Sequence, residues 1–215
     1  MPLATGERML KSDTQRGHMT TTAVRPDPTS AQDAIVRHRW NVDAYYRMAE
    51  AGIFDEDSRI ELVDGVVVDM APIGSTHAFA LNNLTRLLYP KSMNRYLVRI
   101  QDPIHLDDYN EPQPDLVVAL DRNYSAGHPR AADILLVVEV ADTTLIYDRD
   151  VKMPLYARHG IPQCWLLDVN AKTLTVFKEP VDGRYRQAAS ARDIDSVEIG
   201  DLVLAAADLS RLLAA

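Results

Sequence analysis

The sequence is poor in several features, and each scarcity excludes a class of protein. Its 215 residues include one cysteine, Cys164, so no internal disulfide framework can form. No apolar run approaches the roughly 20 residues that a membrane-spanning helix requires. The opening stretch, MPLATGERMLKSDTQRGHM, lacks the apolar core of a secretory signal. We therefore expect a cytoplasmic protein that neither spans a membrane nor relies on disulfides.

Positive charge is also scarce. The chain has 23 Lys and Arg against 31 Asp and Glu, a formal net charge of −8. Proteins that hold nucleic acid mainly through its phosphates are usually basic, which argues against a strong non-specific DNA binder. The charge says less against an enzyme whose metal ions contact phosphate. One stretch of basic residues is a candidate local patch for nucleic acid, or else an ordinary solvated face: Arg86, Lys91, Arg95 and Arg99.

The chain divides near Trp40. Residues 1–38 are rich in Thr, Pro, Ser, Asp and Arg and show no periodicity, so we expect them to be disordered or loosely attached. Residues 39–215 alternate apolar and turn-forming segments and should form a single domain. With 47% hydrophobic and 25% charged residues overall, the chain can bury an ordinary globular core.

The folded part alternates predicted helices and strands. Asn41 is a suitable N-cap for a helix that ends at Gly52, and Asp64-Gly65 is the preferred turn of a hairpin. The later predicted elements are a helix over STHAFALNNLTRLLY ended by Pro90, strands over PDLVVAL and DILLVVEV, a helix from about Asp150 to His159, and strands over CWLLDV, LTVFK and GRYRQAA. This order predicts an α/β domain with a mixed sheet flanked by helices, including at least one parallel pair.

Two acidic residues occupy unusual positions in the predicted buried strands. Glu139 follows an apolar run inside DILLVVEV, and Asp115 opens PDLVVAL. An ionised carboxylate there is costly to desolvate unless it is paired or bound to a metal. If the two strand ends are adjacent, the carboxylates can converge on one hard cation, which prefers oxygen ligands. The alternatives are that Asp115 is only a loop or cap residue and that Glu139 pairs with a buried arginine.

Other polar residues lie close to these strands in the sequence. Pro154 is best tolerated in the first turn of a helix, which places Lys152 in that turn with a side chain long enough to reach an acidic cluster. Glu61 begins the hairpin and is either a further site residue or an exposed strand residue. We interpret His77 as a capping or surface histidine. Three more acids have a structural interpretation as residues at element ends: Asp142, Asp148 and Asp168.

Several blocks of the chain resemble the Uma-two family of putative restriction endonucleases. The resemblance runs from about Trp40 to Tyr185 with the blocks in the family's order. They are RWNVDAYYRMAEAGIFDEDSRIELVDGVVVDMAPIGSTHA, QDPIHL, EPQPDLVVAL, LLVVEVADTTLIYDRDVKMPLYARHGIPQCWLLD and VFKEPVDGRY. It implies a restriction-endonuclease-like fold of the PD-(D/E)XK nuclease superfamily, in which an Asp, an acidic residue and a Lys hold a divalent metal and a water.

The resemblance also implies roles for particular residues. Pro114-Asp115 matches the "PD", and Glu139 matches the second acid. Ala141 stands where the superfamily has lysine, which in the resembling family has moved to the following helix, here Lys152.

The mechanism implied in this way is metal-dependent hydrolysis of phosphodiester bonds, with DNA as the expected substrate. Asp115, Glu139 and the carbonyl of Val140 would bind Mg²⁺, or Mn²⁺ in its place, while Lys152 would orient a water and Glu61 would complete the acidic ring. Cutting both strands by such folds generally implies a dimer, so a homodimer is an expected assembly. The alternative function is a catalytically silent nuclease fold that serves as a binding or assembly module.

Overall fold

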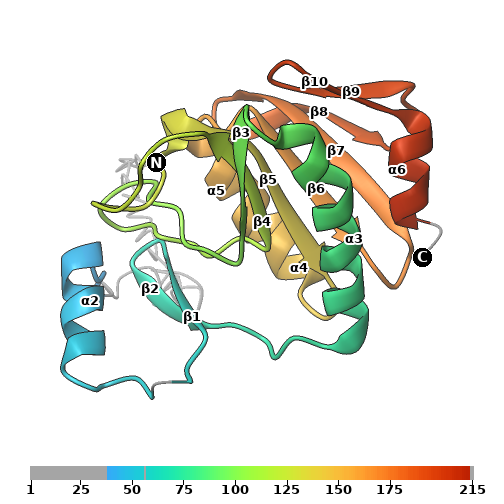
Figure 1. Ribbon diagram of the computed structural model, residues 1–215. Helices are drawn as coiled ribbons and strands as arrows, with labels where there is room; N and C mark the ends of the chain where they lie inside the picture. Colours follow the sequence, from blue (N-terminus) through green and yellow to red (C-terminus); the bar gives the residue numbers. More distant parts are fainter. Residues whose placement is uncertain (1–37, 56, 214–215) are drawn as a thin grey trace, which may run out of the picture. The chain divides into compact units, whose positions relative to one another are not determined.

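The computed structural model describes residues 38–55 and 57–213 (Figure 1). The chain separates into two units, Met1–Arg37 and His38–Ala215, and the fold below is that of the second. The prediction of a disordered or loosely attached segment over residues 1–38 falls almost wholly outside the described residues and stays a prediction. In the described part, no helix has the length and apolar character needed to cross a membrane.

A six-stranded mixed sheet forms the centre of the domain, in the order β3-β4-β5-β6-β7-β8. Its strands are β3 (Tyr96–Ile100), β4 (Leu116–Leu120), β5 (Ile134–Ala141), β6 (Gln163–Asp168), β7 (Thr173–Val181) and β8 (Arg184–Ser190). Strands β5 and β6 pair in parallel, and the other neighbours pair antiparallel. The mixed α/β sheet with a parallel pair, predicted from the sequence, is confirmed.

Helices and a second hairpin cover the two faces of this sheet. One face carries α3 (Ser75–Ser92), the hairpin of β9 (Ser196–Ile199) and β10 (Leu202–Ala205), and α6 (Ala206–Leu213) (Figure 1). The other carries α5 (Met153–Arg158). Strand β4 shows the division, because Leu116 and Val118 pack toward α3 while Val117 and Ala119 pack toward α5. The alternation of side chains along a strand accounts for a run that is apolar at every position.

The helix that follows β5 differs from its predicted form. The helical segment begins earlier, with α4 (Leu145–Tyr147), continues through a π turn (Asp148–Lys152) and then becomes α5. Lys152 therefore lies in the π turn and not in the first turn of an isolated helix. Pro154 lies near the start of α5, where its missing N–H accompanies the change in hydrogen-bonding pattern.

Helix α3 passes through Pro90 and ends at Ser92, so the predicted stop at Pro90 was wrong. Only one backbone donor is lost there, and Leu84, Leu88 and Ser92 keep the last turns packed against the sheet. A proline this near a helix end removes too little to break a well-packed helix.

The N-terminal elements agree with the sequence prediction. Helix α2 (Val42–Glu50) is capped by Asn41, whose side chain accepts a hydrogen bond from Ala44 N at 2.8 Å. Strands β1 (Ile60–Val63) and β2 (Val66–Asp69) form a separate hairpin through Asp64-Gly65, both with positive φ. Glu61 of β1 and residues 70–74, which connect β2 to α3, line one cavity together with Glu139 and Val140 of β5.

Candidate active site

A cavity of about 460 Å³ lies where β5 ends, between the β1–β2 hairpin and the helical segment after β5. The residues that the sequence singled out for the site all line it: Glu61, Asp115, Glu139, Val140 and Lys152. They come from four separate parts of the chain, and the structure brings all five to one place. The four ionisable residues among them are all buried: Glu61, Asp115, Glu139 and Lys152.

Strand register explains why Asp115 and Glu139 share a face of the sheet. Leu116 lies opposite Val138 in the antiparallel β4–β5 pair. Asp115 precedes Leu116 and Glu139 follows Val138, so both carboxylates project to the face opposite that of the Leu116–Val138 pair. The backbone N–H of Val140 also donates to Asp115 Oδ2 at 2.8 Å. The two acids are thus neighbours, as convergence on a common ligand requires.

Lys152 joins Glu139 to Glu61. Its ammonium Nζ lies 3.2 Å from Glu139 Oε1 and 3.0 Å from Glu61 Oε2. Tyr156 OH donates to Glu139 Oε1 at 2.5 Å, and the backbone N–H of Gln113 donates to Glu61 Oε2 at 3.0 Å. Glu139 therefore pairs with a lysine, where the alternative reading of the sequence had a buried arginine.

Burial governs the ionisation of this group. Burial raises the pKa of Glu139 well above its ordinary value, and the Lys152 ammonium only partly opposes that shift. Burial acts to lower the pKa of Lys152, but the nearby Glu139 and Glu61 carboxylates outweigh it and raise that pKa. Lys152 is consequently a permanent cation at neutral pH, surrounded by acids that compete for it.

Asp115 is held by a different set of donors. Its Oδ1 lies 2.8 Å from His77 Nε2 and accepts from Gln101 Nε2 at 3.2 Å. Burial acts to raise the pKa of Asp115, but the hydrogen bond and charge of His77 outweigh it and lower that pKa. The same hydrogen bond raises the pKa of His77 despite partial burial. The interpretation of His77 as a capping or surface histidine was wrong, because its side chain turns into the cavity.

Asp148 is a second residue that the sequence analysis missed. It is buried, lines the cavity, and accepts a hydrogen bond from Thr144 Oγ1 at 2.6 Å. Burial raises the pKa of Asp148, against the influence of Lys152. The spacing of four residues between Asp148 and Lys152 was the available signal, since it puts both on one side of a helical segment.

The other two acids at element ends behave differently from each other. Asp142 lines the cavity. Asp168 instead caps the turn after β6, because its Oδ1 accepts from the backbone N–H groups of Asn170 and Ala171. The structural interpretation therefore holds for Asp168.

Acidic groups outnumber cations in the buried wall of the cavity. Four buried carboxyl groups line it, Glu61, Asp115, Glu139 and Asp148, and Lys152 is the buried ammonium among them. Such an excess is costly to bury unless protons or cations offset it. Across residues 38–55 and 57–213, however, no three His, Cys, Asp or Glu side chains are already arranged as a metal-binding cluster.

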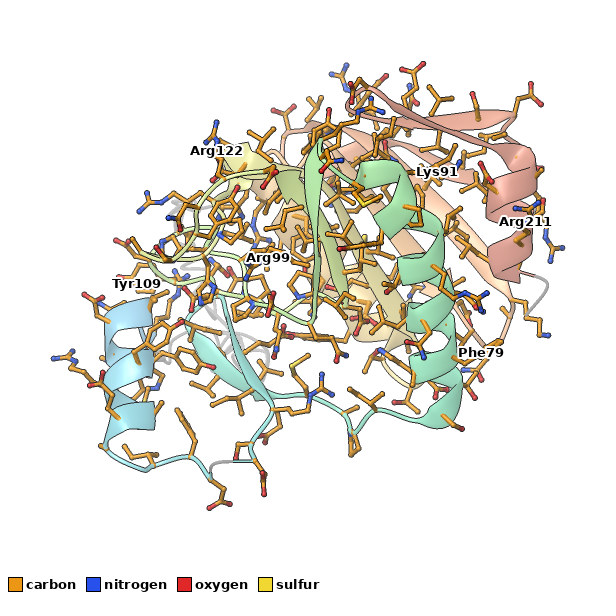
Figure 2. The ribbon with its side chains drawn as sticks, in the orientation of Figure 1. Phe79, Lys91, Arg99, Tyr109, Arg122 and Arg211 are labelled. Carbon is orange, nitrogen blue, oxygen red and sulfur yellow. The ribbon has the colours of Figure 1, made fainter. Side chains whose placement is uncertain are left out.

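Most residues of the candidate basic patch form ion pairs with acidic residues of the same domain. Lys91 lies 3.2 Å from Asp208, Arg95 pairs with Asp201, and Arg99 lies 3.2 Å from Asp102. Figure 2 shows Lys91 and Arg99 well apart on the molecule. These partners reduce the positive charge that the stretch offers to phosphates, which favours the reading of a solvated face.

One solved structure shares this fold, and a second aligns only weakly. A crystal structure of "a putative nuclease belonging to DUF820" from Anabaena variabilis ATCC 29413 is similar at a TM-score of 0.59 and 14% identity, covering 80% of this chain and 98% of that one. The type IIG restriction endonuclease BpuSI aligns at a TM-score of 0.37 and 14% identity, over 67% of this chain and 17% of that one. No curated protein matches the sequence. Residues 42–209 match the Uma2 family, described as "Putative restriction endonuclease", and the chain belongs to that family.

Proposed function

We propose that this protein is a metal-dependent endonuclease that hydrolyses phosphodiester bonds of DNA. One observation carries the proposal: Asp115, Glu139, Glu61 and Lys152, distant in sequence, line one cavity as buried residues. Burying three acids and a lysine together contributes little to stability, because desolvation offsets much of the attraction between them. Such a group therefore suggests a functional role. Membership of the Uma2 family, described as "Putative restriction endonuclease", supports the same chemistry.

The donor set suits Mg²⁺, with Mn²⁺ as a substitute. Mg²⁺ binds hard oxygen ligands, and it typically uses one or two protein carboxylates while keeping waters and substrate phosphates as its other ligands. Asp115, Glu139 and the carbonyl of Val140 are the groups that would hold it. The lack of a ready three-residue cluster in the described chain is compatible with so sparse a protein contribution. When bound, the ion would supply Lewis acidity to the phosphate and lower the pKa of a bound water.

The remaining side chains would orient and stabilise the reacting groups. Lys152, cationic and held within 3.2 Å of both glutamates, would orient the attacking water and offset negative charge that develops on the phosphate. Glu61 would fix the direction of the Lys152 ammonium. Tyr156 would hold the Glu139 carboxylate through its 2.5 Å hydrogen bond.

DNA is the proposed partner, bound chiefly at the cavity because the stretch from Arg86 to Arg99 offers little unpaired charge. A homodimer is the proposed assembly for cutting both strands. We keep the silent nuclease fold as the competing function, and cleavage assays separate the two.

The decisive experiment compares nuclease activity between the wild type and variants of the site residues. Purified full-length protein is incubated with Mg²⁺ or Mn²⁺ and with DNA and RNA substrates. We expect Asp115→Asn and Glu139→Gln each to lower cleavage by at least about a thousandfold, because each replaces a carboxyl group, which would bind the metal ion as an anion, with a neutral amide. Lys152→Ala should also lose orders of magnitude in rate.

Asp168→Asn is the matched control, because it alters a carboxylate that caps a turn outside the cavity. It should cleave like the wild type. A metal titration adds an independent check, since Mg²⁺ should raise the melting temperature of the wild type but not of Glu139→Gln. Wild-type protein that never cuts above the Asp115→Asn/Glu139→Gln double variant would refute the enzymatic function.

A further inference from the structure

His77 is the cavity side chain whose role the proposed function leaves open. It comes from the first turn of α3, a helix that supplies no other side chain to the cavity. Its Nε2 lies 2.8 Å from Asp115 Oδ1, and the two side chains are 15% and 8% exposed. A hydrogen bond between side chains so well covered fixes both partners, because neither can exchange it freely for water.

Asp115 depends on three donors for its orientation. The backbone N–H of Val140 holds Oδ2, while Oδ1 receives Gln101 Nε2 at 3.2 Å and His77 Nε2 at 2.8 Å. The shorter side-chain contact is that of His77. It reaches Asp115 from a helix packed on the sheet, so it ties the carboxylate to a rigid element outside the loop that precedes β4.

The contact does not require a charged ring. A carboxylate only accepts hydrogen bonds, so Nε2 of His77 carries the proton in this contact. A neutral ring in the Nε2–H tautomer and a protonated ring both donate the same bond. The geometry therefore assigns His77 the task of holding a carboxylate, independent of any proton transfer.

We propose that His77 is a positioning residue for the nuclease site, which keeps the Asp115 carboxylate in the orientation that the reaction needs. The inference rests on the proposed function and adds to it a residue that acts through Asp115 without touching the substrate. Side chains that orient a metal-binding carboxylate typically account for about 10- to 100-fold in metal affinity or activity when removed.

The test compares His77→Ala with His77→Gln. The glutamine amide can place an N–H donor near the position of ring Nε2, whereas alanine leaves Asp115 Oδ1 without that donor. His77→Ala should lower kcat about 10- to 100-fold with little change in KM, and should weaken Mn²⁺ binding measured by calorimetry by about tenfold or more. His77→Gln should recover most of both losses.

His159→Ala is the matched control. His159 Nε2 lies 2.9 Å from Asp107 Oδ2, so this variant removes a histidine–aspartate pair of similar length outside the cavity. It should leave kcat and Mn²⁺ affinity unchanged. Melting temperatures of all variants without metal verify that each is folded.

The outcomes separate this inference from the nuclease function. If His77→Ala retains wild-type kcat and Mn²⁺ affinity, or if His77→Gln is as impaired as His77→Ala, the positioning role is overturned; the second result would point to the ring itself. If the wild type binds Mn²⁺ without cutting nucleic acid, and affinity falls in His77→Ala and recovers in His77→Gln, the nuclease function fails while the positioning role stands. If the wild type binds no Mn²⁺, the positioning role of His77 is overturned.

Discussion

At the scale of single residues, the distinctive feature is one ammonium shared by several buried acids. Lys152 contacts Glu61 and Glu139, and Asp148 also influences its ionisation. Removing one partner of a buried ion pair typically costs about 3–5 kcal/mol, because the other charge stays buried and uncompensated. Glu139 can lower that cost by taking up a proton, because burial raises its pKa and so favours the protonated form.

Lys152→Met should therefore lower stability in a pH-dependent way. With its folded-state pKa raised above the unfolded value, Glu139 binds a proton more readily in the folded protein, so stability falls as pH rises between the two values. Without Lys152 that raised pKa should rise further and widen the interval. We expect urea denaturation to show a larger loss of unfolding free energy at pH 8 than at pH 6.

Lys91→Met provides the comparison, because Lys91 forms a partly exposed pair with Asp208. Exposed pairs contribute at most about 1 kcal/mol, so this variant should show a small loss with little pH dependence between 6 and 8. An equal loss at both pH values in Lys152→Met would contradict the ionisation assigned to Glu139.

At the scale of elements, the β1–β2 hairpin matters because it carries Glu61 to the cavity. Its turn needs a left-handed backbone at Gly65, where φ is +75°. An added Cβ there would lie 2.7 Å from Cβ of Arg39, too close for an ordinary contact. The left-handed backbone and the close approach of Arg39 both favour glycine at this position.

Gly65→Ala should destabilise the hairpin by about 1 kcal/mol or more and reduce cleavage through displacement of Glu61. Thermal unfolding and a cleavage assay measure the two effects. Gly127→Ala is a suitable comparison, because an added Cβ at Gly127 meets nothing within 4 Å and its φ is not left-handed. Equal melting temperatures for the two variants would show that the turn does not constrain the hairpin.

Some helices and strands could be predicted from the sequence, and others could not. The strands β4, β5 and β6 were predictable because short apolar runs that are rich in β-branched residues and bounded by turn residues are typical of buried strands. The end of α3 was not, since packing of Leu88 and Ser92 overrides the local effect of Pro90. The π turn also escaped prediction, because its hydrogen bonding depends on the tertiary contacts of the segment that connects β5 to β6.

The same limit applied within the site. Asp115, Glu139 and Lys152 drew attention because charge in or beside apolar strands is costly, and the family resemblance supported them. His77 carried no such sign, because its partner Asp115 is 38 residues away and only the fold brings the two together. Asp148 was similar: an acid near a helix start usually caps it, and burial in a cavity depends on tertiary structure.

At the scale of the whole molecule, the net charge of −8 and the paired basic residues predict a weak electrostatic contribution to DNA binding. Affinity falls with salt in proportion to the number of phosphates that Lys and Arg neutralise. We expect the slope of log affinity against log salt to be shallower than about −3, as measured by fluorescence anisotropy with labelled DNA.

A charge-releasing variant tests the same idea in the opposite direction. The double variant Asp201→Asn/Asp208→Asn frees Arg95 and Lys91 from their partners, so the slope should become steeper. A slope near −6 in the wild type would instead reveal an extensive phosphate-binding surface elsewhere on the protein.

The parallel pairing of β5 with β6 has a consequence for how the protein folds. Two parallel strands cannot be joined by a tight turn, so residues 142–162 must cross over the sheet before β6 can pair. That crossover contains Asp148, Lys152 and Tyr156. The chain therefore cannot complete its central sheet without also bringing these side chains to Glu139 and the cavity that it lines, so folding of the sheet and assembly of the candidate active site are coupled.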